Sequence, residues 1–249
     1  MSNFQKVTIG DAILYSGDCL ELIDKIEDFD ALITDPPYSS GGMTASSRTM
    51  QPSQKYISST EYDYSKLEVL GDNKDALGWA FWSTIWMSCC HHRMKDGAPV
   101  ISFTDWRQLP NTTNVIQAAG FIWRGVGVFA KPNYRRQCGR FGAQAEYFAW
   151  GTKGSMGMDY TKKALPGVYT YSAPAPTKRL HMTEKPLQLM VDLLQITQPG
   201  CTVFDPFMGA ATTGIAALQS SRKFVGIELH PQYFKIACKR VEDFYRNQE

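Results

Sequence analysis

The sequence has no apolar run of eighteen or more residues, so it predicts no helix that crosses a membrane. Its start, Met-Ser-Asn-Phe-Gln-Lys, lacks the apolar stretch of a secretory signal, and we expect a cytoplasmic protein. Cysteine is sparse, and six without an export signal favour reduced thiols over a disulfide framework. Neither sign of charge dominates, because 26 basic residues face 24 acidic ones, and the net charge of +2 favours no class of partner.

What is present is a globular composition, with 43% hydrophobic residues in a chain of 249, enough for one sizeable core. Short apolar segments alternate with helical patterns and turn signals, which predicts an α/β fold with a doubly wound, mostly parallel sheet. We therefore expect a single domain over residues 1–249. The expected strands are Phe29–Thr34, Pro99–Phe103, Phe121–Ala130, Ala145–Trp150, Thr202–Asp205 and Lys223–Glu228, and the expected helices are Ala76–Met94, Leu109–Ala119, Pro186–Thr197, Thr212–Gln219 and Pro231–Asn247.

Two long stretches, residues 39–75 and 151–180, show little periodicity and are rich in polar residues and glycine. Irregular connections of this size in a compact domain are usually functional loops. Residues 121–185 also concentrate positive charge, with 11 basic and 3 acidic side chains and many aromatic residues between them. Such a segment could bind a polyanion and stack its bases, or it could be a solvated basic face beside core aromatics. Charge alone does not choose between these interpretations.

The turn after the expected strand Phe29–Thr34 reads Asp35-Pro36-Pro37-Tyr38. Two prolines hold the backbone extended, which leaves the Pro36 carbonyl free to accept a hydrogen bond from a ligand. Asp35 is a second acceptor, and Tyr38 offers a flat face for a planar ring. An exocyclic amine on a nucleobase fits this arrangement, although the same residue types also occur in ordinary turns.

A second turn, residues 203–214, follows a strand and opens a helix, as nucleotide-binding loops do. Its only glycines are Gly209 and Gly214, a poor match to the dinucleotide pattern, so a pyrophosphate-bearing cofactor is not expected. Glu228 ends the next strand, where such folds place a carboxylate that accepts from ribose hydroxyls. These features indicate a nucleoside ligand without phosphates.

Together these motifs resemble the β class of S-adenosylmethionine-dependent DNA amino-methyltransferases, which modify adenine N6 or cytosine N4. The resemblance covers most of the chain and rests on Asp35–Tyr38, on His181-Met182-Thr183-Glu184-Lys185-Pro186 and on Asp205-Pro206-Phe207-Met208-Gly209, in the permuted order of that class. Weaker matches are Gly17-Asp18, similar to a contact with the cofactor's adenine, and the pair Lys131 and Glu146 beside the base-binding region.

The resemblance implies a Rossmann-like methyltransferase fold, S-adenosylmethionine as cofactor, S-adenosylhomocysteine as product and no metal. The implied catalytic residues are Asp35, Pro36, Pro37 and Tyr38, and the implied cofactor-binding residues are Asp18, His181, Lys185, Asp205, Pro206, Phe207, Gly209, Thr212, Thr213 and Glu228. For His181 a structural role at a helix start is the alternative. Aspartate at position 35 favours adenine, because the cytosine enzymes of the family more often carry serine there.

Duplex DNA is the implied partner, and the target base must leave the helix before its amine can react. Residues 39–75 would form an active-site and DNA-binding loop, and residues 151–180 a small target-recognition region. A homodimer and a companion restriction endonuclease are further possible partners. The basic side chains expected to contact phosphates are Lys131, Arg135, Arg136, Arg140, Lys153, Lys162 and Lys163.

One departure from the family concerns the cofactor loop, where Ala211 replaces a glycine. A methyl group at that position could crowd the cofactor or a turn that needs positive φ. A DNA-binding module that kept the fold and lost catalysis is therefore the alternative function.

Other patterns favour structural roles. Cys89-Cys90-His91-His92 is not expected to bind zinc, because consecutive helical residues point to different sides. Trp79, Trp82 and Trp86 are expected in the core.

Overall fold

The computed structural model describes residues 4–38, 74–134, 138–157, 164–172 and 184–248. In this part of the chain one nine-stranded sheet forms the centre of the molecule. Its strands follow in the order β1 (Gln5–Ile9), β2 (Ala12–Ser16), β9 (Lys223–Glu228), β8 (Thr202–Asp205), β3 (Ala31–Thr34), β4 (Pro99–Thr104), β6 (Ala145–Thr152), β5 (Ile122–Ala130) and β7 (Val168–Thr170).

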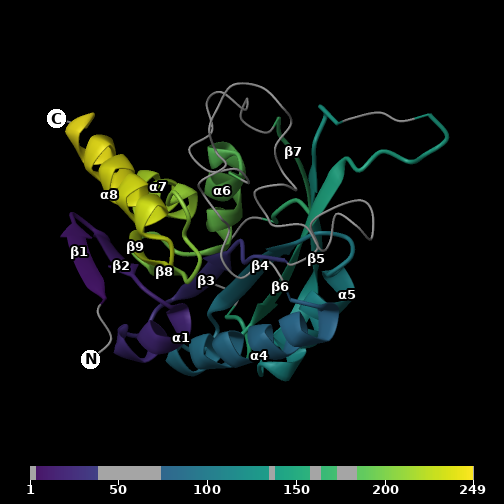
Figure 1. Cartoon of the computed structure of the whole chain (residues 1–249), viewed down its shortest axis with the longest axis horizontal. Coiled ribbons are helices and arrows are strands. Elements are labelled where there is room, and N and C mark those ends of the chain that lie inside the picture. Colours follow the sequence, from purple (N-terminus) through teal and green to yellow (C-terminus); the bar gives the residue numbers. More distant parts are fainter. Residues whose placement is uncertain (1–3, 39–73, 135–137, 158–163, 173–183, 249) are drawn as a thin grey trace.

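Strands β2, β9, β8, β3 and β4 are parallel, and β5 is parallel to β7. Antiparallel pairing joins β1 to β2 and attaches β6 to both β4 and β5. Helices cover both faces, which is the doubly wound arrangement predicted from the sequence (Figure 1). One face carries α6 (Leu187–Leu193), α7 (Thr212–Gln219) and α8 (Pro231–Arg246), and the other carries α1 (Cys19–Leu22), α4 (Ala76–Arg93) and α5 (Leu109–Ala118).

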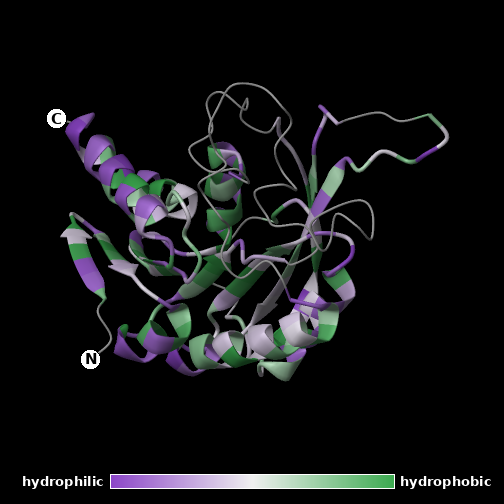
Figure 2. Ribbon diagram, in the orientation of Figure 1, coloured by the Kyte–Doolittle hydropathy of each residue, from purple (hydrophilic) through white to green (hydrophobic). Residues whose placement is uncertain are grey.

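The central strands are hydrophobic because helices bury them on both sides. Every residue of β3 and β4 is buried, and the hydropathy colouring shows the apolar centre of the sheet between polar helix surfaces (Figure 2). Trp79 and Trp86 of α4 are fully buried, which confirms their predicted place in the core. No helix of the described residues is long and apolar enough to span a bilayer.

Several elements differ from the sequence prediction. Strand β1 has no counterpart in it, and β7 lies within the stretch 151–180 that was predicted to be irregular. The helix predicted over Pro186–Thr197 is shorter, because a 3-10 turn over Leu194–Ile196 follows α6. Of the predicted loop 39–75, residues 39–73 lie outside the described residues.

The carboxyl ends of the parallel strands meet at one edge of the sheet, which we call the carboxyl edge. Neighbouring strands bring five acidic residues there from distant parts of the sequence. They are Asp18 after β2, Glu228 at the end of β9, Asp205 at the end of β8, Asp35 after β3 and Asp105 after β4.

Candidate active site at the carboxyl edge

The turn Asp35–Tyr38 begins where β3 ends, and side chains from α4 and from the residue before α5 fix its backbone. The indole Nε1 of Trp79 donates to the Pro37 carbonyl at 2.6 Å, and the Nε2 of Gln108 donates to the Tyr38 carbonyl at 3.0 Å. No described residue donates to the Pro36 carbonyl. The structure thus satisfies the two carbonyls that follow Pro36 and leaves its own without a described partner.

Sequence reasoning missed these two supports. Trp79 gave only a core signal, and Gln108, which is 4% exposed, gave none. Helical spacing predicts which face of α4 is buried, but it cannot show which carbonyl an indole N–H will meet.

A buried charge cluster surrounds the Asp35 carboxylate. Lys185, 7% exposed, donates to both Asp35 and the Tyr38 hydroxyl, and Tyr38 itself donates to Asp35. The Lys185 Nζ also lies 3.4 Å from Glu146, whose other oxygen pairs with Lys131 at 2.8 Å. Two ammonium groups therefore neutralise two carboxylates.

The electrostatics of this cluster follow from burial and from the shared lysine. Burial raises the pKa of Asp35 above its ordinary value, and the charge of Lys185 opposes that rise. Burial also opposes ionisation of Glu146, yet Lys185 and Lys131 together lower its pKa to about 2. Burial and then the charge of Asp35 raise the pKa of Tyr38, so its hydroxyl stays protonated as a donor.

The geometry gives two of the predicted site residues structural contacts. Lys185, predicted among the cofactor residues, lies against the Asp35 carboxylate. Lys131, predicted to contact DNA phosphates, pairs with Glu146. Sequence spacing could not show that residues 35, 146 and 185 meet.

The turn after β8 is organised by the side chain of Asp205, which is 2% exposed. It accepts from the Thr34 hydroxyl at 2.7 Å, the Thr213 hydroxyl at 2.8 Å and the Phe207 amide at 3.0 Å. Burial raises the pKa of Asp205 to about 6, although these hydrogen bonds oppose the rise. Asp205 and Thr213 therefore hold the shape of the loop and join it to the end of β3.

Glu228 and Ala211 complete this loop. The Glu228 carboxylate accepts from the amides of Gly209 at 2.9 Å and His230 at 2.7 Å, and burial raises its pKa to about 7. Ala211 has φ +60° and ψ +39°, in the left-handed region that favours glycine. The sequence concern about a turn of positive φ is thereby confirmed.

Arg240 of α8 is a third support that sequence reasoning missed. It pairs with Glu184 at 2.8 Å and donates to the Ala210 carbonyl at 3.1 Å and the Thr212 hydroxyl at 3.0 Å. Thr212 in turn donates to Glu184 at 3.2 Å. The Arg240 guanidinium thus joins the loop after β8 to Glu184, the residue before Lys185.

Aromatic residues of α4 pack against Phe207 in the loop after β8. The Phe207 ring lies 5.4 Å from the Trp82 ring and 5.0 Å from the Trp86 ring, measured between centroids. Helix α4 therefore contacts both turns, through Trp79 at Pro37 and through Trp82 and Trp86 at Phe207.

Asp18 lies beside this loop, because the Gly17 amide donates to the Glu228 carbonyl at 3.0 Å. Its carboxylate caps α1 by accepting from the Leu20 amide at 2.9 Å. The residue is thus near enough to Glu228 to share a ligand, with one structural hydrogen bond already made.

The predicted phosphate-binding residues do not all face this edge. Lys153 lies at the opposite edge, where it donates to the Met94 carbonyl at 2.7 Å, and its phosphate contact stays a prediction. Arg140 is exposed in the connection between β5 and β6, which leaves the sheet at the carboxyl edge (Figure 1). The remaining predicted residues lie outside the described residues: they are Arg135, Arg136, Lys162 and Lys163, and also His181.

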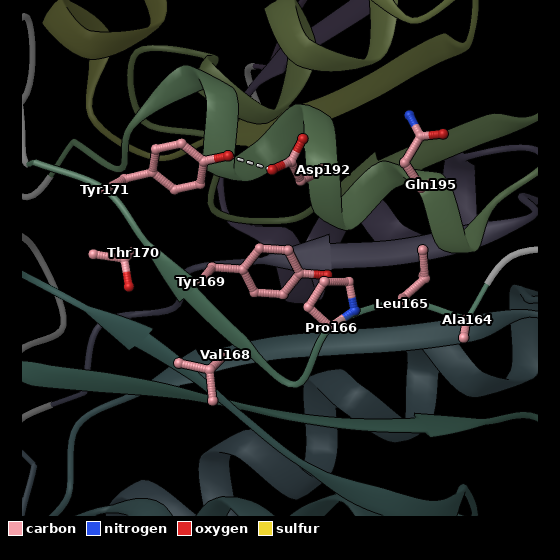
Figure 3. A pocket seen from close by; sticks show the side chains of 9 residues that line it. All are labelled: Ala164, Leu165, Pro166, Val168, Tyr169, Thr170, Tyr171, Asp192 and Gln195. Carbon is pink, nitrogen blue, oxygen red and sulfur yellow. Dashed lines mark hydrogen bonds between the residues drawn. The ribbon is translucent and has the colours of Figure 1, made fainter.

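A cavity of about 450 Å³ lies between residues 164–171 and α6 with its following turn (Figure 3). Tyr169 and Tyr171 line one wall, and the Tyr171 hydroxyl donates to Asp192 on the other. Part of the predicted target-recognition region thus packs near the helix that follows Lys185. The negative charge of Asp192 makes this cavity a poor site for a phosphate.

The cofactor implied by the resemblance can be tested against these residues. A nucleoside needs a carboxylate for its hydroxyls and an apolar surface for its ring, and Glu228 and Phe207 supply both beside one loop. A positively charged sulfonium also suits an edge that gathers carboxylates. Among the described residues no group of three or more His, Cys, Asp and Glu side chains is placed to hold a metal ion.

Comparison with known proteins agrees with this geometry. Residues 29–239 match the N6/N4 methyltransferase family, described as DNA methylase. The chain is 26% identical over 263 residues to the type II methyltransferase M2.MboI of Moraxella bovis, covering 92% of this chain and 87% of the relative.

Two solved structures share the fold. The complex of M1.HpyAVI with SAM superposes with a TM-score of 0.67 at 24% identity, covering 92% of this chain and 98% of that one. The cytosine-N4-specific PvuII DNA methyltransferase gives 0.69 at 17% identity, covering 98% and 96%. With the family match spanning most of the sequence, the chain belongs to the N6/N4 family of DNA methylases.

Proposed function

We propose that this protein transfers the methyl group of S-adenosylmethionine to the exocyclic N6 amine of adenine in duplex DNA. The observation that carries the proposal is the pair of acceptors at the turn after β3. These acceptors are the Asp35 carboxylate and the Pro36 carbonyl. No described residue donates to the Pro36 carbonyl, and Trp79 of α4 and Gln108 before α5 fix the backbone of the turn.

The chemistry follows from the poor nucleophilicity of the amine, whose lone pair is delocalised into the ring. Two acceptors for the two amine protons favour a pyramidal nitrogen with a localised lone pair. When bound, S-adenosylmethionine would supply an electrophilic methyl group: the nitrogen would form a bond to the methyl carbon, and the carbon–sulfur bond would break with its electron pair left on sulfur. The nitrogen then loses one proton to Asp35, which passes it to solvent. Most of the rate enhancement comes from positioning.

In the free protein the contacts of Asp35 favour its role as a hydrogen-bond acceptor for the amine. Lys185 favours the ionised carboxylate, and the Tyr38 hydroxyl occupies it as a temporary donor. An incoming amine would take the place of that hydroxyl, which frees the Tyr38 ring to stack on the base. The base must first leave the duplex, because its amine is otherwise paired and stacked.

The cofactor would be held by the loop after β8 and the end of β9. We assign the ribose hydroxyls to Glu228 and the adenine ring to Phe207, with Asp18 near the same ring. Asp205, Pro206, Gly209, Thr212 and Thr213 shape the loop, and S-adenosylhomocysteine is the product.

For DNA, we propose phosphate contacts by Arg140 together with Arg135, Arg136, Lys162 and Lys163. A restriction endonuclease is a proposed companion, because the similar M2.MboI is a type II methyltransferase. We also propose a cytoplasmic location and a homodimer.

Cytosine N4 is the second candidate, because its amine presents the same two protons and the similarly folded PvuII enzyme is cytosine-N4-specific. The test is incubation with methyl-labelled S-adenosylmethionine and unmethylated mixed-sequence DNA, followed by nucleoside digestion and mass analysis. Label in N6-methyladenine supports the proposal, and label in N4-methylcytosine moves the target to the second candidate. DNA binding without label would mean that Ala211 has cost the activity.

A further inference from the structure

One exposed tryptophan at the carboxyl edge has no part in the site described above. Trp106 lies in the turn between β4 and α5 and is 60% exposed, whereas Trp79 and Trp86 are fully buried. A single exposed apolar side chain is common on protein surfaces, so exposure alone indicates nothing. The position and the contacts of the turn that bears Trp106 are more specific.

The turn that bears Trp106 is held against the turn Asp35–Tyr38. In the parallel pairing of β3 and β4, Thr34 lies opposite Ser102, so the chain after β4 leaves the sheet beside the turn Asp35–Tyr38. Gln108, two residues after Trp106, donates to the Tyr38 carbonyl at 3.0 Å.

The turn is also fixed in shape. One oxygen of Asp105 accepts from the amides of Arg107 at 2.9 Å and Gln108 at 3.0 Å. The side chain of Arg107 lies 3.5 Å from Asp105, and its guanidinium lies 5.1 Å from the centre of the Trp106 ring. A rigid turn therefore presents an indole plane with a cation beside it, next to Tyr38.

We propose that Trp106 stacks on the DNA bases next to the target nucleotide when that nucleotide leaves the duplex. A flat aromatic side chain can cover the base face that flipping exposes, and an adjacent cation suits the phosphates nearby. This inference rests on the proposed DNA substrate and adds a residue outside the family motifs. Trp106 acts on DNA affinity, not on cofactor binding or the chemical step.

The test compares Trp106→Ala and Trp106→Phe with a matched control, Trp123→Ala. Trp123 is 42% exposed, but it lies near the start of β5, at the opposite edge of the sheet. Binding is measured by fluorescence anisotropy with a labelled mixed-sequence duplex, S-adenosylmethionine affinity by calorimetry, and methyl transfer on unmethylated plasmid DNA.

Loss of one stacked base corresponds to a DNA affinity lower by about 5- to 150-fold. We expect this loss, and a matching rise in KM for DNA, in Trp106→Ala, with affinity for the cofactor and kcat at saturating DNA unchanged. Trp106→Phe retains most of the affinity, and Trp123→Ala binds like the unaltered protein. Equal DNA affinity in Trp106→Ala and Trp123→Ala would overturn the inference. Failure of the unaltered protein to methylate any DNA would instead reject the proposed function.

Discussion

Replacement of Lys185 by methionine tests the buried charge cluster directly. Lys185 contacts Asp35, Glu146 and the Tyr38 hydroxyl, and only 7% of its surface is exposed. Methionine keeps an unbranched apolar stem and removes the charge. Among the described residues, Glu146 then keeps its ion pair with Lys131, whereas Asp35 loses its ion pair.

The expected cost follows from burial. Removing one partner of a buried ion pair costs about 3–5 kcal/mol, because the remaining charge keeps its desolvation penalty. A total free energy of unfolding of about 5–15 kcal/mol makes such a loss large. Lys131→Met is the matched control, because Lys131 is 24% exposed and its loss leaves Glu146 paired with Lys185. We expect Lys131→Met to lower the free energy of unfolding by clearly less than Lys185→Met does.

The loss of unfolding free energy in Lys185→Met also depends on pH. Without Lys185, the pKa of Asp35 in the folded state rises further above its unfolded value of about 3.9. A group with a raised pKa stabilises the fold below the unfolded pKa, and that contribution is lost as pH rises through the folded pKa. The variant should therefore lose stability, relative to the unaltered protein, as pH rises above about 4.

Urea unfolding followed by tryptophan fluorescence at several pH values measures this loss, and methyl transfer by the folded variant should also fall. If Lys185→Met cost no more than Lys131→Met, or the same amount at every pH, the assigned charge cluster would be refuted.

Three other changes test separate parts of the site. Asp35→Ala should abolish methyl transfer and leave S-adenosylmethionine affinity, measured by calorimetry, nearly unchanged; unaltered turnover would exclude the proposed amine acceptor. Because burial raises the pKa of Glu228 to about 7, cofactor affinity should increase from about pH 6 to about pH 8 as the carboxylate ionises, and Glu228→Gln should weaken binding and remove this dependence. Ala211→Gly relieves about 1–2 kcal/mol of left-handed strain and loses about 0.4–1 kcal/mol through the freer unfolded chain, so urea unfolding should show a stabilisation between about 0 and about 1.6 kcal/mol. Clear destabilisation would mean that burial of the methyl group outweighs the strain.

Much of the fold could be predicted from local patterns. Helix α4, strand β8 and strand β9 lie within one residue of their predicted bounds, because long apolar segments and strong turn residues define them. Strands β1 and β7 were missed because each is short and partly exposed, so hydrophobic alternation is weak. The antiparallel pairing of β6 also needs three-dimensional information, because a strand's sequence does not state its direction.

The sequence by itself determined the motifs, their order and the chemical types of the reacting groups, because these depend on residue identity and short spacing. It indicated Asp35–Tyr38 as an acceptor turn and Ala211 as a strained position. Only the tertiary structure decided that Lys185 forms an ion pair with Asp35 and Lys131 with Glu146, and that Lys153 lies at the edge opposite the carboxyl edge. It alone revealed Trp79, Gln108 and Arg240 as supports. These contacts join residues far apart in the chain, and their geometry is set by the packing of helices on the sheet, which no local pattern records.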